Sequence, residues 1–214
     1  YENGIYIKKD TNKAIHYYSL AADQNNLKAQ YSIGCVNFGT LIYKKGINKA
    51  IHYYTLASKL DNIYAQFELG KTYLQGKYIT QDIDKGIYYL KLAANHNNSN
   101  AQFGLGLIYD QGWYVKQDIN KAIHYYTLAA DLNNSNAQFN LGLIYARGEY
   151  YSCDIDKVIH YLSLAADQNH LNAQYILGIV DFNDIKTRKG IEKAIHYYSL
   201  AANQNNIIAQ FFLG

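Results

Sequence analysis

The chain has 214 residues, of which 49% are hydrophobic and 17% charged, and its formal net charge is +3. This composition is typical of a globular protein and excludes a disordered chain, while the small net charge argues against a dedicated nucleic-acid binder. No apolar run is long enough to cross a bilayer, so we expect no membrane insertion. The sequence begins with Tyr1 and contains no Met, so we expect the true N-terminus to lie outside it.

The first predicted helix carries the sequence KAIHYYSLAADQNN at positions 13–26, and a copy with one difference stands at 193–206. The dipeptide Ala-Gln recurs at a step of 36 residues (65 minus 29), beginning at Ala29, Ala65, Ala101, Ala137, Ala173 and Ala209. A fixed period of this size indicates stacked repeats. Because no insertion interrupts the period, we expect one continuous solenoid over 1–214, with about six units and incomplete at both ends.

Each unit is predicted to contain two helices, and residues 99–112 illustrate the first, called helix A. One helical face carries four apolar side chains at helical spacing, Ala101, Leu105, Ile108 and Tyr109. Asn98 or Ser99 is a plausible N-cap, and Gly112 stands where a C-terminal glycine belongs. The pattern therefore predicts an amphipathic helix that ends at a glycine turn.

Residues 118–134 illustrate the second helix, called helix B. Asp118 is its expected N-cap, and the Asn pair at 133–134 ends it. The predicted buried stripe consists of Ala122, Ile123, Tyr126, Ala129 and Ala130. Two short helices joined by short turns lie antiparallel and must bury their faces on neighbouring units. Small residues recur where we expect helices to touch: Gly70, Gly106, Gly142 and Gly178.

The repeated pattern resembles a known family. Its residues are Ala101, Leu105, Gly106, Tyr109 and Gly112, then Asp118, Lys121, Ala122, Tyr126, Ala129 and Ala130. It is similar to the Sel-1-like repeat over essentially the whole chain. The related tetratricopeptide repeat fits less well, because its period is about 34 residues and it favours Pro, which this chain lacks. The resemblance implies an all-α fold, a right-handed α/α superhelix (solenoid) of 36-residue helix-turn-helix repeats, used as an adaptor or scaffold for other proteins.

Two units, at 34–46 and 178–190, depart from this pattern. Both lack the aligned Tyr and carry a glycine where the Asp cap stands elsewhere; the residues are Asn37, Asp181, Gly46 and Gly190. We therefore expect the loops between helix A and helix B in these units to differ in shape from the other three. Their basic residues are Lys44, Lys45, Lys186, Arg188 and Lys189, which are either solvated or face an acidic partner.

Five of the seven histidines occupy one position of helix B, three residues after a recurring Lys: His16, His52, His124, His160 and His196. Neighbouring units stack about one helix diameter apart, roughly 10 Å, whereas zinc needs donor atoms at about 2 Å. We therefore predict no metal site and no cofactor. Two interpretations stay open: an exposed surface position, or a basic stripe that responds to pH.

The other recurring polar residues favour structural roles. The second Tyr of each Tyr pair should fill space between units, and base stacking is not expected without a basic groove. The Gln of each Ala-Gln dipeptide should lie at the edge of helix A and bond to a neighbouring helix end or turn. Cys35 and Cys153 are more than three units apart, too far for a disulfide. No nucleophile–base pair, phosphate loop or carboxylate pair appears, so we predict no enzyme activity.

The predicted partner-binding residues are those that vary on helix A. By analogy with the family, helices A line the concave side, and their non-stripe positions differ from unit to unit. The candidates are Glu68, Lys71, Gly104, Leu107, Asn140, Leu143, Ile176 and Ile179. Leu107, Leu143 and Ile179 are expected to form an apolar strip that accepts a peptide or a partner helix.

Three functions are compatible with this pattern. The first is a non-catalytic adaptor or scaffold that binds a peptide or partner protein on its concave face. The second is a structural or assembly component that stacks on further repeats or subunits, since Phe211, Phe212 and Leu213 should need a cap at the C-terminal end. The third is the regulatory region of an enzyme outside this segment. We expect a soluble, intracellular protein of AT-rich coding bias, as in large DNA viruses or amoeba-associated microbes.

Overall fold

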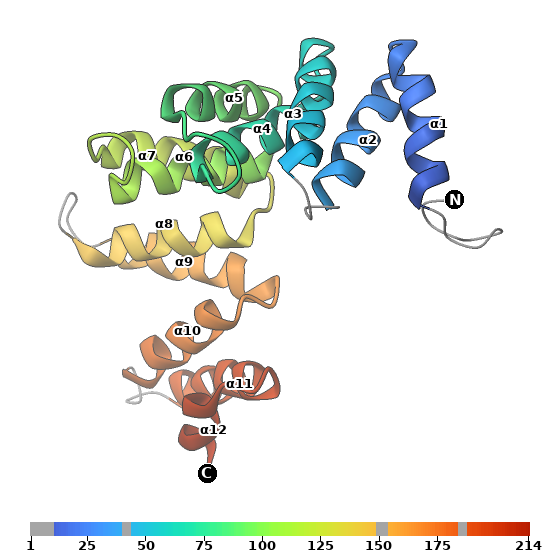
Figure 1. Ribbon diagram of the computed structural model, residues 1–214. Coiled ribbons are helices and arrows are strands. Elements are labelled where there is room, and N and C mark those ends of the chain that lie inside the picture. The colour runs from blue at the N-terminus through green and yellow to red at the C-terminus, as the bar shows by residue number, and fades with distance from the viewer. Residues whose placement is uncertain (1–10, 40–43, 149–153, 184–187) are drawn as a thin grey trace. The chain divides into compact units, whose positions relative to one another are not determined.

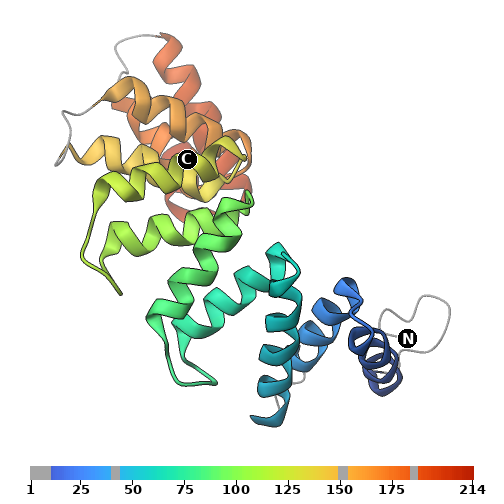
Figure 2. The same cartoon turned by 90° about the horizontal axis from the view of Figure 1, so that it is seen from above.

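The computed structural model describes residues 11–39, 44–148, 154–183 and 188–214. Within these ranges the chain forms twelve helices and no strand (Figure 1; Figure 2 shows the view from above). They are α1 (Thr11–Asp23), α2 (Leu27–Gly39), α3 (Lys44–Lys59), α4 (Ile63–Gln75), α5 (Ile83–Asn95), α6 (Ser99–Gln111), α7 (Ile119–Asp131), α8 (Ser135–Arg147), α9 (Ile155–Asp167), α10 (Leu171–Asn183), α11 (Arg188–Asn203) and α12 (Ile207–Leu213).

The helices alternate between the two predicted types. Helices α2, α4, α6, α8, α10 and α12 are helix A, and α1, α3, α5, α7, α9 and α11 are helix B. The chain divides into two compact units, Tyr1–Ala101 and Gln102–Gly214, which are described separately below. Within the second unit, α8 and α9 lie side by side and run in opposite directions, as α10 and α11 do (Figure 1).

Capping residues set where the helices begin and end. The Asp118 side chain accepts a hydrogen bond from the Lys121 backbone N–H at 3.0 Å, so this residue is the predicted N-cap of α7. At the other helix type, Asn98 accepts from the Ala101 N–H at 2.9 Å. Gly112 takes a left-handed conformation with φ of +66°, which favours glycine and ends α6. Each N-cap typically stabilises its helix by about 1 kcal/mol.

The turn from helix B to the next helix A is also repeated. The second of its three residues is left-handed, with φ between 57° and 64°, at Asn25, Asp61, Asn97, Asn133, Asn169 and Asn205. Asn and Asp tolerate this conformation better than other residues with side chains. The next residue then caps helix A through its side chain. The two residues of the predicted Asn pair therefore have different roles: the first forms the turn and the second caps the next helix.

His170 replaces the capping Asn in one of these turns. Its Nδ1 accepts a hydrogen bond from the Ala173 N–H at 3.3 Å, and its ring stacks on Phe139 with centroids 4.5 Å apart. Protonation of Nδ1 would remove the acceptor and place a positive charge at the positive end of the α10 dipole. Burial lowers the pKa of the His170 imidazole below its ordinary value.

We predict an acid-sensitive contribution of His170 to stability. Because its pKa is lower in the folded protein, the unfolded chain binds the proton first, and stability falls as the pH drops below about 6.5. The variant His170→Asn keeps a cap that does not titrate. Urea unfolding gives the free energy of unfolding of both proteins at pH 7.5 and pH 5.5. The difference between the variant and wild type should shift by about 1 kcal/mol in favour of the variant at the lower pH. Equal losses in the two proteins would contradict this account.

The two departing units have longer B helices. Helices α3 and α11 have 16 residues each, whereas α5, α7 and α9 have 13. The difference lies at the N-terminus, where the predicted Asp cap is replaced by Gly46 and Gly190 inside the first turn. These two helices therefore begin earlier than the other B helices, whereas the predicted difference in loop shape stays a prediction. Residues 40–43 and 184–187 of the connections lie outside the described residues.

Glycine lets helix A and helix B of one repeat approach closely. An added Cβ at Gly106 would lie 2.4 Å from a ring carbon of Tyr126, which is fully buried. The same relation holds between Gly34 and Tyr54 and between Gly178 and Tyr198. The predicted role of these glycines in close packing is confirmed. The second Tyr was predicted to fill space between units, and the Tyr126 ring does both: it packs against Gly106 of its own repeat and belongs to the core cluster with Leu141 of the next one.

The recurring Gln ties each helix A to the end of the preceding helix B. Gln138 is 1% exposed, and its Nε2 donates to the Ala130 carbonyl at 3.2 Å. Equivalent bonds are made by Gln30, Gln66, Gln174 and Gln210. The predicted bond to a helix end is confirmed. The predicted location at the helix edge is wrong for Gln30, Gln66, Gln102, Gln138 and Gln174, because they are buried.

In the second compact unit, the end of helix B in the same repeat adds a bond to this Gln where it carries another Gln. Gln168 donates to the Oε1 of Gln138 at 2.7 Å, and Gln204 donates to that of Gln174 at 2.8 Å. In the first unit, the residue that aligns with Gln168 and follows Gln30 is Leu60. Among the described residues, the buried Oε1 of Gln30 has no hydrogen-bond partner. The bond from the recurring Gln to a backbone carbonyl is thus constant, whereas the additional bond between two Gln side chains varies from repeat to repeat.

Candidate functional site

The eight predicted partner-binding residues all lie on helices A. Each is half-buried: the structure places Glu68 and Lys71 on α4, Gly104 and Leu107 on α6, Asn140 and Leu143 on α8, and Ile176 and Ile179 on α10. We call this set the helix-A surface. Glu68 and Lys71 belong to the first compact unit and the other six to the second, so the two parts are described in turn.

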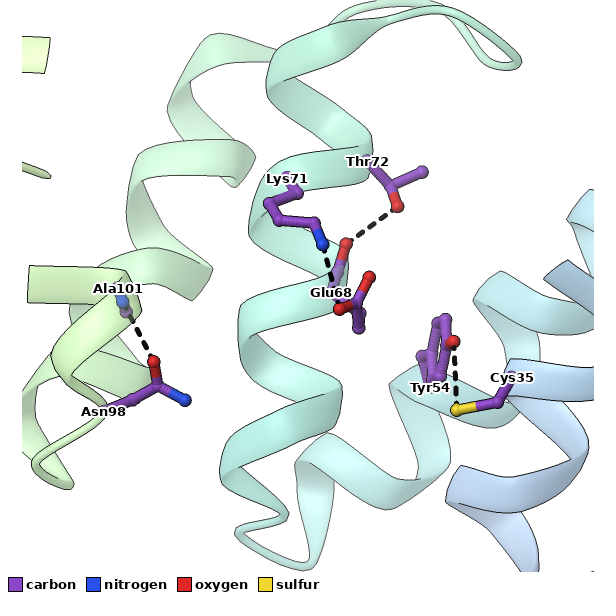
Figure 3. A network of polar contacts seen from close by, with 7 residues as sticks. All are labelled: Cys35, Tyr54, Glu68, Lys71, Thr72, Asn98 and Ala101. Carbon is purple, nitrogen blue, oxygen red and sulfur yellow. Dashed lines mark hydrogen bonds and ion pairs between the residues drawn. The ribbon is translucent and has the colours of Figure 1, made fainter. Parts of the chain in front are cut away.

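In the first unit, the predicted residues on α4 bond to each other. The Lys71 ammonium lies 2.9 Å from a Glu68 carboxylate oxygen (Figure 3). It also lies 4.8 Å from the centre of the Phe67 ring. The Thr72 hydroxyl donates to the Glu68 backbone carbonyl at 2.7 Å. This part of the helix-A surface therefore presents a paired acid and base and carries little net charge.

A cluster that sequence reasoning did not predict lies beside this pair. The Tyr54 hydroxyl donates to the Cys35 Sγ at 3.5 Å (Figure 3). The Tyr31 ring lies 5.9 Å from the Tyr54 ring. Burial, and then the hydrogen bond to Cys35, raise the pKa of the Tyr54 phenol well above its ordinary value. Both tyrosines stay protonated at neutral pH and act as packing and donor groups. Cys35 forms no disulfide within the described residues, and Cys153 lies outside them.

In the second unit, the predicted residue Asn140 is joined to a buried polar network. Its Nδ2 donates to the Tyr126 hydroxyl at 3.0 Å, and that hydroxyl donates to Asp110 Oδ2 at 3.3 Å. Asp110 is 4% exposed, and the Arg147 Nη1 lies 3.8 Å from its other oxygen. Burial, and then the charge of Asp110, raise the pKa of Tyr126. The network links α6, α7 and α8.

The apolar members of the helix-A surface are partly used by the core. Leu107 packs against the cluster that contains Tyr126 and Leu141. Ile176 packs against the next cluster along the chain, and Ile179 against the last. Each still exposes part of its side chain. A partner that binds here would therefore cover side chains that are already partly packed against the core. Because these side chains are partly ordered before binding, less side-chain entropy is lost.

The opposite, B-helix positions carry the recurring Lys and His. The Lys121 ammonium lies 2.9 Å from Asp118 and 5.3 Å from the Tyr109 ring centre, and Tyr109 stacks on Tyr125. Hydrogen bonds from the Lys121 backbone and then from its side chain lower the pKa of Asp118. The same arrangement recurs around Lys85 and Lys157. The Tyr and the Asp missing from the two departing units are therefore parts of one arrangement.

The predicted histidine ladder is exposed. All five of its histidines, His16, His52, His124, His160 and His196, have exposed side chains and contact the next Tyr edge-on at 5.1–5.3 Å. Within the described residues, no group of three or more His, Cys, Asp or Glu side chains is placed to hold a metal ion. None of the helices in those residues is long and apolar enough to span a membrane.

A pocket of about 310 Å³ in the first unit lies away from the helix-A surface. It lies beside the connection from α4 to α5, and its polar lining includes Asp82 and Lys85. These two side chains form an ion pair with a distance of 2.8 Å, and Lys85 also lies over Tyr73. Asp82 and Lys85 thus bond to each other within the repeat instead of facing a ligand in the pocket.

Comparison with known proteins agrees with this architecture. The Sel1 repeat model matches residues 1–26, 27–62, 63–98, 99–134, 135–170 and 171–206. The chain belongs to the Sel1 repeat family. Its fold class, an all-α superhelical repeat, is the one predicted. Sel1 repeats typically serve as non-catalytic scaffolds for protein interactions, which implies protein partners in general.

Two crystal structures of Sel1 repeat proteins are similar over most of the chain. A Sel1 repeat protein from Oxalobacter formigenes has a TM-score of 0.80 and 28% identity, with 95% of this chain and 83% of that one covered. A protective antigen of uropathogenic Escherichia coli with an SLR fold has a TM-score of 0.69 and 24% identity. There, 99% of this chain matches 53% of the antigen. No curated protein matches this Sel1 repeat chain.

Proposed function

We propose that this Sel1 repeat chain is a protein-interaction scaffold that binds a peptide or a partner protein on the helix-A surface. The observation that carries the proposal is the contrast between frame and surface. Caps, turns, glycines and the Gln bond recur from repeat to repeat, whereas the half-buried positions of helix A vary along the chain, as Glu68, Gly104, Asn140 and Ile176 do. A constant frame with a variable face is how repeat proteins acquire specific partners.

The part of this surface best suited to bind a peptide lies in the second compact unit. Leu107 and Leu143 occupy the same position in successive repeats, and both are partly exposed. Asn140 lies one helical turn before Leu143 and is held in place by its bond to Tyr126. Apolar side chains next to a fixed polar group suit a peptide that needs both burial and orientation.

We predict that the double change Leu107→Ala and Leu143→Ala weakens partner binding at least tenfold. Peptides selected from a random library displayed on phage, with the full chain as the target, provide the ligand, and calorimetry gives the Kd. A tenfold loss corresponds to about 1.4 kcal/mol, which truncation of side chains at the centre of an interface is sufficient to cause. The matched control is His124→Ala with His160→Ala, which alters helix B, and circular dichroism verifies that both variants are folded.

If the Leu107/Leu143 variant binds the selected peptides as tightly as the unchanged chain, the helix-A surface is not the binding site and the proposal fails.

A further inference from the structure

Asp110 is a carboxylate at a position that is apolar in the flanking repeats. The aligned residues are Leu74 and Ala146, and sequence reasoning that looked only for recurring residues passes over it. It lies in the last turn of α6 and is 4% exposed, so its charge is removed from water. Burying a carboxylate is unfavourable unless hydrogen bonds and a cation compensate it.

Only one of the two Asp110 carboxylate oxygens accepts hydrogen bonds that offset its burial. Its Oδ2 accepts from the Gln111 amide at 3.0 Å and from the Tyr126 hydroxyl at 3.3 Å. Its Oδ1 is buried and has no hydrogen-bond partner among the described residues. The Arg147 Nη1 is 3.8 Å from Oδ1, beyond hydrogen-bond distance. One carboxylate oxygen is therefore left without a donor, which calls for a functional explanation.

The surroundings indicate what would supply the donor. Leu107 precedes Asp110 by one turn on α6, and Leu143 precedes Arg147 by one turn on α8, so the carboxylate lies beside the apolar part of the helix-A surface. Arg147 has a side chain that is 46% exposed, so it can move into water at little cost. Lysine and arginine combine a long apolar stem with a cationic donor, which suits leucines next to a carboxylate.

We propose that Asp110 receives a lysine or arginine side chain of the bound partner. The incoming cation donates to Oδ1 and takes the place of Arg147, while its stem lies against Leu107 and Leu143. The partner is thus an apolar peptide segment with one basic residue. This inference rests on the proposed function, because it names the chemistry that the helix-A surface recognises.

The variant Asp110→Leu tests this inference, because leucine is the residue at the aligned position 74. Phage-displayed random peptides are selected on the full chain, and the enriched peptides are synthesised. We expect them to carry a Lys or Arg next to apolar residues. Replacing that residue with Ala, or Asp110 with Leu, should each weaken binding at least about tenfold, with little further loss when the two changes are combined.

Thermal unfolding separates this role from a purely structural one. If Asp110 is kept for binding, Asp110→Leu should raise the melting temperature while it weakens binding. Peptides that lack a basic residue, or that bind Asp110→Leu as tightly as wild type, overturn the inference. If those peptides still depend on Leu107 and Leu143, the proposed function stands and only the role of Asp110 fails.

Discussion

Replacing Gly106 with alanine should destabilise the protein by about 1–3 kcal/mol, although alanine favours a helix over glycine by about 1 kcal/mol. The added methyl group would lie 2.4 and 2.5 Å from two ring carbons of Tyr126. That ring is fully buried, and its hydroxyl bonds to Asp110 and accepts from Asn140, so it cannot turn away without breaking the network. Urea unfolding followed by circular dichroism measures the loss.

The matched control for this change is Gly104→Ala on the same helix. The aligned residues Glu68 and Asn140 carry side chains at half-exposed positions, so a methyl group is tolerated there. The control should stabilise the protein by about 0.4–1 kcal/mol, because alanine restricts the unfolded chain. If Gly106→Ala is as stable as the control, the close contact between helix A and helix B does not explain the recurring glycine.

Replacing Gln138 with leucine should cost about 1–3 kcal/mol. Leucine nearly matches the volume but cannot donate to the Ala130 carbonyl or accept from Gln168. The bond to Ala130 is buried, whereas the bond from the exposed Gln168 is only partly buried. The change therefore leaves polar groups at a buried junction without partners. It tests whether the Gln of every Ala-Gln dipeptide is kept for the frame rather than for a ligand.

A double-mutant cycle between Gln138 and Gln168 isolates the bond between helix A and the end of helix B within one repeat. Gln168→Ala alone should cost about 0.5–1.5 kcal/mol, and the double variant should lose less than the sum of the two single changes. Losses that add within about 0.3–0.5 kcal/mol would show that the 2.7 Å bond contributes nothing. Circular dichroism in urea gives all four free energies of unfolding.

The sequence predicted the recurring parts of the structure well, because they obey local rules. Asp118 caps α7 and Gly112 ends α6 through side-chain bonds and backbone angles that depend on a few neighbouring residues. Gly106 was recognised because its cost in a helix must be offset by packing. The missing Asp cap at Gly46 and Gly190 predicted a different connection in these two repeats but not that α3 and α11 would begin earlier than the other B helices.

The residues that the sequence did not reveal act through contacts between distant segments. Asp110 is recognised as unusual only when its burial and its bond to Tyr126 are known. The Cys35 bond to Tyr54 likewise joins residues of different helices, α2 and α3. A signal was present in both His170 and Asp110, since each departs from the residue type of its repeat position, but a departure alone does not indicate its role.

Hydrogen–deuterium exchange of the full chain, with and without a selected peptide, tests the central proposal most directly. If the helix-A surface of the second unit binds the peptide, exchange should slow in α6 and α8, over residues 103–111 and 139–147, and change little in α7 and α9. Protection confined to residues 119–131 and 155–167, where the Lys and His of helix B are exposed, would contradict the proposal.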